Sequence, residues 1–162
     1  MIQGKIKAVW TAKDFIKGSW RTNKNHYLSF NTTSKNKQIY RENVGVYINN
    51  DVDKKFEKIA NRFKLKNTVV ALNKMTPGQI LPFHTDTCRT FIKRNKVKDK
   101  SKIMRIIVFL QNSEPGHQLW IGNKVCTGPS GSYFGWEYGQ EHMAANLGKK
   151  DRYTLQITGV KK

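Results

Sequence analysis

The chain has 162 residues, which suits one domain with a substantial core, and 38% of them are hydrophobic. It carries 30 Lys and Arg against 11 Asp and Glu, a net charge of +19 that would attract polyanions, although an AT-rich genome would also enrich Lys. Two cysteines, Cys88 and Cys126, exclude a secreted disulfide framework and a cysteine-based zinc site, and no apolar run has the length of a signal peptide core or a membrane span.

The first elements along the chain are short. KIKAVW at residues 5–10 alternates briefly and predicts an edge strand. Residues 19–49 are polar and basic, with strand-like pieces HYLSF and VGVYI, and we expect loops with one hairpin there.

The clearest helix is predicted over residues 51–64. Apolar residues recur there at helical spacing and form one stripe that faces the core: Val52, Phe56, Ile59, Ala60 and Phe63. Asn50 or Asp51 is expected to cap its N-terminus.

From residue 67 onward the sequence predicts strands separated by turn signals such as TPG and SEPG. The expected strands are NTVVALNKM, QILPFHTDT, KIMRIIVFLQ, QLWIG, GSYFGW and DRYTLQITGV. One early helix followed by many short strands predicts a single, mainly β domain over residues 1–162, a sandwich or jelly roll with helical support.

H-T-D at residues 84–86 is a candidate metal motif. In an extended strand, His84 and Asp86 project from the same face and can converge on one ion. Two histidines and one carboxylate form the facial site of non-haem Fe(II) oxygenases. Taken alone, the motif is weak and fits a solvated His and Asp at a strand end better than a metal site.

A third ligand must come from the remaining histidines. His142 lies 58 residues after His84, in GWEYGQEHMAAN, and is the best candidate. His117 stands in SEPGHQ, where an exposed turn is expected, and His26 stands in the polar N-terminal region.

Arg152 opens the last predicted strand, ten residues after His142. Thr154 shares its face, whereas Tyr153 and Leu155 point the other way. The polar face is either exposed to solvent or directed into a barrel, where a buried Arg requires an anion such as a dicarboxylate.

The segments H-T-D, M-R-I-I-V-F-L, E-H-x-x-x-N and D-R-Y-T-L-Q-I, in this order over residues 67–160, resemble the iron(II)- and 2-oxoglutarate-dependent oxygenases. The likeness is to their aspartyl/asparaginyl β-hydroxylase-like branch, which includes small proteins of bacteria and phages. It implies a double-stranded β-helix (a cupin-like jelly roll) over residues 67–160, supported by residues 1–66, in the cytoplasm of a bacterial or phage-infected cell. It also implies Fe(II), 2-oxoglutarate and O₂ as reactants.

The resemblance assigns roles to individual residues. His84, Asp86 and His142 correspond to the metal ligands. Arg152 corresponds to the partner of the distal carboxylate of 2-oxoglutarate, and Thr154 to a hydroxyl that assists it.

Five further residues are placed near this site. Arg105 resembles an arginine that approaches the co-substrate, and Asn146 is expected to shape the turn after the distal His. Asn73 and Gln79 either reach the co-substrate or face solvent, and Cys88 either shares the metal-facing side or is a packing or loop residue.

The stretch from residue 89 to residue 102 is strongly basic, with Asp99 as its one acidic residue. Its cations are Arg89, Lys93, Arg94, Lys96, Lys98, Lys100 and Lys102. Such a charge run is usually a solvated loop, but this one begins three residues after Asp86, and our hypothesis is that it is a substrate loop that recruits an acidic or phosphate-bearing molecule.

Three functions remain open at this stage. The resemblance favours hydroxylation of a protein or peptide side chain. The charge of +19 and the basic stretch favour an oxygenase that acts on nucleic acid, whereas the absence of a second Arg shortly after Arg152, which the known nucleic-acid demethylases have, argues against it. Among enzymes, a small-molecule substrate is a further alternative. The third is a non-catalytic, polyanion-binding jelly-roll module. The oligomeric state is not predicted.

Overall fold

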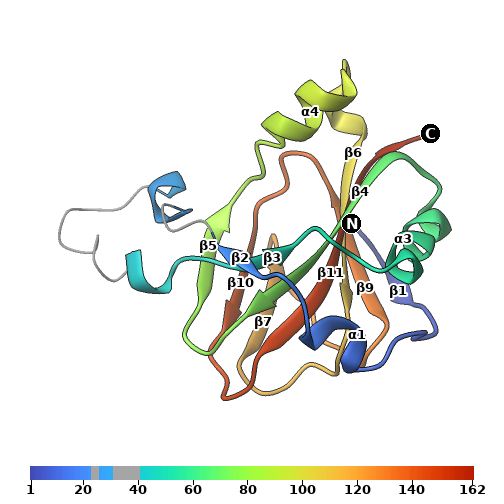
Figure 1. Ribbon diagram of the computed structural model, residues 1–162. Coiled ribbons are helices and arrows are strands. Elements are labelled where there is room, and N and C mark those ends of the chain that lie inside the picture. Colours follow the sequence, from blue (N-terminus) through green and yellow to red (C-terminus); the bar gives the residue numbers. More distant parts are fainter. Residues whose placement is uncertain (23–25, 31–40) are drawn as a thin grey trace.

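The computed structural model describes residues 1–22, 26–30 and 41–162, in which two antiparallel sheets dominate (Figure 1). In these residues the larger sheet has seven strands in the order β1-β9-β6-β11-β4-β3-β2. They are β1 (Ile2–Lys5), β2 (Arg21–Thr22), β3 (Tyr47–Asn49), β4 (Leu65–Met75), β6 (Ile103–Phe109), β9 (Ser132–Glu137) and β11 (Arg152–Lys161). The smaller sheet has the order β5-β10-β7-β8. Its strands are β5 (Ile80–His84), β7 (His117–Ile121), β8 (Lys124–Val125) and β10 (His142–Asn146).

The strand order defines the fold. From β4 onward the chain alternates between the larger and the smaller sheet, with β7 and β8 paired in the smaller one. The four strands β9-β6-β11-β4 therefore face the four strands β5-β10-β7-β8, which is the winding of a double-stranded β-helix. This confirms the predicted mainly β jelly roll, to which β1, β2 and β3 add edges.

The helices are short. Within the described residues they include α1 (Lys13–Ile16), α3 (Lys54–Ala60) and α4 (Arg89–Asn95), with 3₁₀ turns η1 (His26–Ser29), η3 (Asn61–Phe63) and η4 (Lys100–Lys102), and residues 41–43 are also helical. Among the described residues, no helix is both long and apolar enough to cross a membrane. In Figure 1, α3 lies beside the larger sheet, whereas α4 stands clear of both sheets at one end of the molecule.

The larger sheet is covered on both faces. On its outer face, Leu155 and Ile157 of β11 pack with Phe56 of α3, and all three are buried. On its inner face, Ile107 and Phe109 of β6 join a second cluster with residues of the smaller sheet. A strand with two buried faces is expected to be mostly apolar, which explains why every residue of β6 except Arg105 is apolar.

Some predicted elements differ from the structure. The edge strand expected at residues 5–10 is β1, at Ile2–Lys5, and beyond it Trp10 is buried with its indole N–H donating to the carbonyl of Leu110. HYLSF forms the 3₁₀ turn η1 instead of a strand. The expected hairpin of HYLSF with VGVYI is therefore not formed, and β3, within VGVYI, pairs instead with β2 at Arg21–Thr22. Residues 23–25 and 31–40, part of the expected loops, lie outside the described residues.

The predicted helix over residues 51–64 is shorter in the structure. It consists of α3 and η3, and its cap is Asp53, whose side chain accepts a hydrogen bond from the backbone N–H of Lys55. The expected caps Asn50 and Asp51 were wrong because residues 51–53 are not helical. The apolar stripe is confirmed, since Phe56 and Ile59 are buried against the larger sheet.

This cap gives a prediction about stability. Asp53→Ala removes an N-terminal acceptor and should lower the free energy of unfolding by about 1 kcal/mol. For a chain of this size, the melting temperature should fall by about 2–4 °C in thermal denaturation followed by circular dichroism. Asp51→Ala is the control and should have the melting temperature of the parent. A larger fall in melting temperature for Asp51→Ala than for Asp53→Ala would contradict the assignment of the cap.

Candidate metal centre and anion pocket

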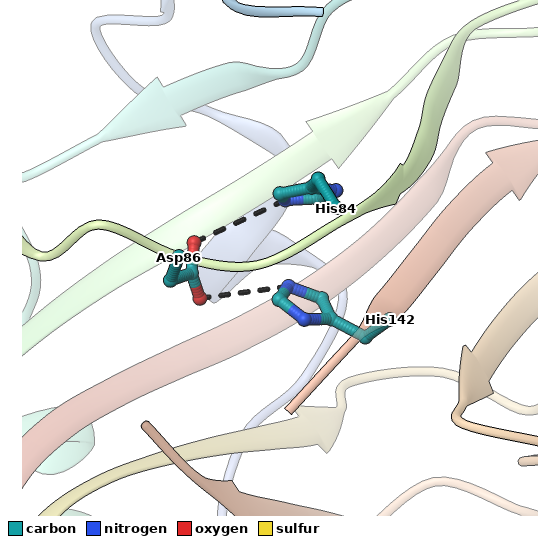
Figure 2. A group of neighbouring side chains, drawn as sticks. All are labelled: His84, Asp86 and His142. Carbon is teal, nitrogen blue, oxygen red and sulfur yellow. Dashed lines mark ion pairs between the residues drawn. The ribbon is translucent and has the colours of Figure 1, made fainter. Parts of the chain in front are cut away.

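Strand pairing brings the predicted metal ligands together. In the smaller sheet, His142 at the start of β10 pairs directly with His84 at the end of β5. Asp86 lies two residues beyond β5, outside the regular strand. Figure 2 shows the three side chains pointing toward one another, and their ligand atoms all lie within 4.8 Å of one another. The i, i+2 spacing on a strand was therefore not what aligned His84 with Asp86.

The separations suit a single ion after a small contraction. Asp86 Oδ1 lies 3.9 Å from His84 Nε2, and Asp86 Oδ2 lies 3.5 Å from His142 Nε2. Two neighbouring ligand atoms, each about 2.1 Å from a divalent ion, are about 3 Å apart. Side-chain movements of less than about 1 Å would close this group around a metal.

The tautomer of both histidines is set by the backbone. Nδ1 of His84 lies 2.7 Å from the carbonyl oxygen of Pro82, and Nδ1 of His142 lies 3.0 Å from that of Gln140. A carbonyl oxygen only accepts, so each Nδ1 carries the proton and donates it. Each Nε2 therefore presents its lone pair to the centre of the group, as a metal-binding histidine does.

His142 is kept neutral by its surroundings. Its side chain is buried and its ring centroid lies 4.5 Å from that of Trp136. Burial lowers the pKa of His142 from 6.5 to about 4, against a smaller opposing effect of Asp86. The imidazole is therefore uncharged at neutral pH and needs no deprotonation to bind a metal.

The same shift predicts how the metal-free protein responds to acid. A depressed pKa means that the unfolded chain binds the proton more tightly, so stability is present above pH 6.5 and is lost as the pH falls toward 4. A shift of this size corresponds to a loss on the order of 3 kcal/mol. Urea denaturation in the presence of a chelator should show it, and His142→Gln should flatten this dependence. An equally steep dependence in His142→Gln would contradict the assignment.

Arg105 occupies the space behind Asp86. Its Nε lies 2.8 Å from Asp86 Oδ2, and its Nη2 donates to Cys88 Sγ over 3.7 Å. Neither Arg105 Nε nor Asp86 Oδ2 has a partner aligned for a hydrogen bond, although both are buried. The sequence predicted a contact of Arg105 with the co-substrate; in the structure it pairs with the candidate ligand. Cys88 contacts Arg105 and is not part of the metal group.

Arg152 is a buried cation without an anion. It begins β11 opposite Met75, is 6% exposed, and contacts Met75 Sδ at 3.6 Å and the ring of Phe109 at 5.8 Å. Burial lowers the pKa of Arg152 to about 10, which leaves it charged at neutral pH. Its Nη2 has no hydrogen-bond partner in the described part of the protein. Desolvating a charge in this way is costly unless an anion joins it.

One cavity connects the metal group to Arg152. It has a volume of about 230 Å³ and lies between the two sheets. His84, Asp86, His142, Arg105 and Arg152 all line it. Among the described residues, Asp86 is the acidic side chain on its wall, and it is already paired with Arg105. Arg152 therefore faces a cavity that supplies it with no carboxylate.

Other polar residues reach the same cavity. Thr154 lines it and is buried, so the polar face of β11 points inward and not to solvent. Asn73 and Gln156 also line it, linked by a hydrogen bond of 3.2 Å from Asn73 Nδ2 to Gln156 Oε1, while Asn73 Oδ1 is buried without a partner. Gln156 belongs to the same strand face as Arg152 and Thr154, so the alternation of side chains along β11 also predicts its position. Gln79 instead accepts from the backbone N–H of Thr76 and stabilises a turn.

The two remaining histidines lie outside the metal group. His117 was expected in an exposed turn, but it begins β7 and is buried, because its Nε2 bonds the carbonyl of Lys150 at 3.2 Å and holds it inside. His26 lines the cavity, and Phe30 beside it packs edge-on against His84 with ring centroids 5.3 Å apart. The polar sequence around His26 gave no signal for this position.

Asn146 holds the end of β10 in place. It is fully buried, and its Nδ2 donates to the carbonyls of Met75 and Lys150 at 2.7 and 2.9 Å. Its Oδ1 accepts from the N–H of Gly148. This confirms the turn-shaping role predicted for Asn146 and ties the β10–β11 turn to Met75, the strand partner of Arg152.

The basic stretch after Asp86 is largely helical. It contains α4 and η4, so the expectation of a loop was wrong for residues 89–95 and 100–102. Arg89, Lys93 and Arg94 lie on α4, and Lys96 ends it in a left-handed conformation with φ of 49°. All four side chains are exposed.

Comparison with known proteins gives distant structural likeness alone. No family model and no curated protein matches the chain. Similar solved structures include a predicted oxalate decarboxylase from Thermotoga maritima (16% identity, TM-score 0.46, covering 72% of this chain and 81% of that one). KdgF from a Halomonas species is 10% identical with a TM-score of 0.46, over 72% of this chain and 80% of that one. An RmlC-like cupin protein from Desulfovibrio desulfuricans is 17% identical with a TM-score of 0.40, over 58% and 73%. Likeness at this level bears on neither activity nor ligand, and the fold rests on the strand order itself.

The geometry predicts metal binding by the group His84, Asp86 and His142. A Co(II) titration followed by visible absorbance should saturate, and His84→Ala or His142→Ala should weaken binding by more than about 100-fold, because even outer-shell changes cost about 10- to 100-fold. His117→Gln alters a buried histidine outside the group and should bind like the parent. Unchanged binding in both alanine variants would contradict the assignment.

Proposed function

We propose that this protein is an Fe(II)- and 2-oxoglutarate-dependent oxygenase. The observation that carries the proposal is Arg152, a buried and unpaired guanidinium on the wall of the cavity that also contains the His84, Asp86 and His142 group. A metal group alone fits many activities. A metal group that shares a small cavity with a cation in need of a carboxylate fits an enzyme that uses an acidic co-substrate.

The donor set suits a ferrous ion. Two neutral imidazoles and one carboxylate leave open positions on the metal, and this combination is typical of non-haem Fe(II) oxygenases. When bound, the ion supplies the oxidising chemistry: the decarboxylation of 2-oxoglutarate to succinate with O₂ is coupled to oxidation of a substrate C–H bond. The protein orients the two Nε2 lone pairs through Pro82 and Gln140, and it holds Asp86 beside Arg105.

The charge inventory of the cavity favours a dianion. Arg105, Arg152 and Asp86 together leave one net positive charge when the lining histidines are neutral. A divalent metal would raise that charge further, and 2-oxoglutarate would bring two negative charges to offset it. The guanidinium of Arg152 matches a carboxylate in two-point geometry, and the buried hydroxyl of Thr154 on the same strand face is suited to assist.

The size and lining of the cavity also suit this co-substrate. At about 230 Å³ it lies below the range of about 300–1,000 Å³ typical of sites for drug-sized ligands, as expected for a compact diacid. Ile107, Leu119 and Trp136 contribute apolar walls that limit the access of water. Exclusion of water strengthens the pairing of Arg152 with a carboxylate.

Two hypotheses from the sequence, one on the substrate and one on a non-catalytic role, remain predictions. The family resemblance implies a protein or peptide side chain as the substrate. A non-catalytic jelly-roll module is the alternative to an enzyme, and it would bind polyanions without consuming 2-oxoglutarate. Turnover of 2-oxoglutarate to succinate by the Fe(II)-loaded protein separates the two, since a binding module produces no succinate above the level of a His84→Ala control.

Arg152→Met tests the anion site through stability as well as activity. Methionine has a similar length and removes the uncompensated buried charge, so we expect the ligand-free variant to be more stable than the parent by about 1–3 kcal/mol. The same variant should lose the increase in melting temperature that 2-oxoglutarate gives the parent, and should lose turnover.

Arg62→Met is the matched control, because Arg62 is exposed on η3 and does not line the cavity. It should change neither the stability nor the response to 2-oxoglutarate. If Arg152→Met kept the response to 2-oxoglutarate, or if the ligand-free variant were destabilised, the account of Arg152 would be wrong.

A further inference from the structure

A basic groove lies next to the metal group. Its volume is about 390 Å³, and six residues line it: Thr87, Arg89, Ile92, Lys93, Lys100 and Tyr138. We call it the α4 groove. It contains three cations, one aromatic ring and one aliphatic side chain, and no acidic side chain lines it in the part of the chain that the structure describes.

The cations around the α4 groove are unpaired. All seven Lys and Arg residues between positions 89 and 102 are exposed, and within the described residues none of them forms an ion pair. Asp99, the acidic residue of this stretch, instead accepts from the backbone N–H and the hydroxyl of Ser101, at 3.0 and 2.6 Å, and caps η4. Asp99 supplies one negative charge against seven positive ones, so the stretch keeps a large net positive charge.

The rest of the protein does little to reduce this charge. Ten of the chain's 11 acidic residues lie outside this stretch, and several of them are engaged in contacts of their own. Asp14, Glu114 and Glu137 pair with lysines outside the stretch, Asp53 caps α3 and Asp86 pairs with Arg105. With a net charge of +19 for the whole chain, these acidic residues leave a large excess of positive charge.

The α4 groove and the cavity are connected through the chain. Thr87 directly follows Asp86, and Cys88 between Thr87 and α4 contacts Arg105. Tyr138, which also lines the groove, lies two residues after Trp136, whose ring packs against His142. The groove and the cavity are therefore lined by neighbouring residues of the same two chain segments.

We infer that the α4 groove binds the phosphodiester backbone of single-stranded nucleic acid. Lys and Arg track a phosphate backbone, and an aromatic ring among them offers a surface on which an unpaired base can stack, which is the usual composition of single-strand sites. An acidic protein would use the cations but has no requirement for Tyr138. The inference names the substrate class of the oxygenase and in that respect rests on the proposed function, although the binding itself needs neither metal nor co-substrate. It differs from the protein side chain that the family resemblance implies.

The test is fluorescence anisotropy of the full chain with labelled oligo-dT and oligo-U of about 15 nucleotides, and with a poly-Glu peptide, over a range of salt concentrations. The triple variant Arg89→Glu, Lys93→Glu and Lys100→Glu should weaken oligonucleotide binding by more than about 100-fold. It should reduce the slope of log K against log salt by about 2, or about 0.7 for each of three lost phosphate contacts.

A second triple variant controls for net charge. Lys13→Glu, Lys17→Glu and Lys58→Glu alters exposed lysines on the α1 and α3 side and changes the net charge by the same amount. It should bind oligonucleotides within about threefold of the parent at moderate salt. Equal losses in both triple variants would show that the whole surface and not the α4 groove binds, and would overturn the inference.

Tyr138 distinguishes a nucleic acid from an acidic protein. Tyr138→Ala should weaken oligonucleotide binding about tenfold and Tyr138→Phe should preserve it, because stacking requires the ring and not the hydroxyl. Poly-Glu that binds as tightly as the oligonucleotides, with no effect of Tyr138→Ala, would assign the groove to acidic proteins and overturn the inference. Comparison of oligo-dT with oligo-U identifies which nucleic acid is preferred. Since the assay contains no Fe(II) or 2-oxoglutarate, failure here leaves the proposed oxygenase activity untouched, and failure of turnover leaves the groove untouched.

Discussion

Arg152 carries a permanent charge into the interior of the β-helix, because β11 lies between β4 and β6 and both faces of this sheet are covered. Within the residues that the structure describes, that charge has a sulfur and an aromatic ring beside it but no carboxylate. Such an arrangement costs stability, and a domain with a net stability on the order of 10 kcal/mol has little reserve for it. We attribute the cost to function: an anion from solution would complete the site.

The candidate metal ligands depend on closure of the smaller sheet. His84 and His142 are 58 residues apart in sequence and become direct strand partners only when β10 pairs with β5. Asn146 then fixes the far end of β10 to Met75, and Met75 is the strand partner of Arg152. One buried amide thus connects the strand of a metal ligand to the strand that carries the anion-binding residue. Loosening of this link would disturb both halves of the site together.

The regular elements could be predicted where the sequence itself shows a pattern of polar and apolar residues. Such patterns are the apolar stripe of α3, the mostly apolar sequence of β6 and the alternation of polar and apolar residues at the start of β11. The position of Asp86 could not be derived in this way, because it follows the end of β5 and its direction depends on the loop that leads to α4. The pairing of Arg105 with Asp86, the burial of His117 and the approach of His26 to the cavity arise from contacts between distant segments. The local sequence pattern around each of these residues does not indicate such contacts.

The most direct test of the account is an anaerobic titration of the metal-free protein with Fe(II) and then 2-oxoglutarate, followed through the visible charge-transfer band of the complex. The account predicts a band that appears in the parent, is absent in His84→Ala, and needs at least about 100-fold more 2-oxoglutarate in Arg152→Met, since about 1.4 kcal/mol corresponds to each tenfold change. A parent protein that retains Fe(II) but develops no band with 2-oxoglutarate would contradict the assignment of Arg152. A parent that retains no Fe(II) would contradict the metal site itself.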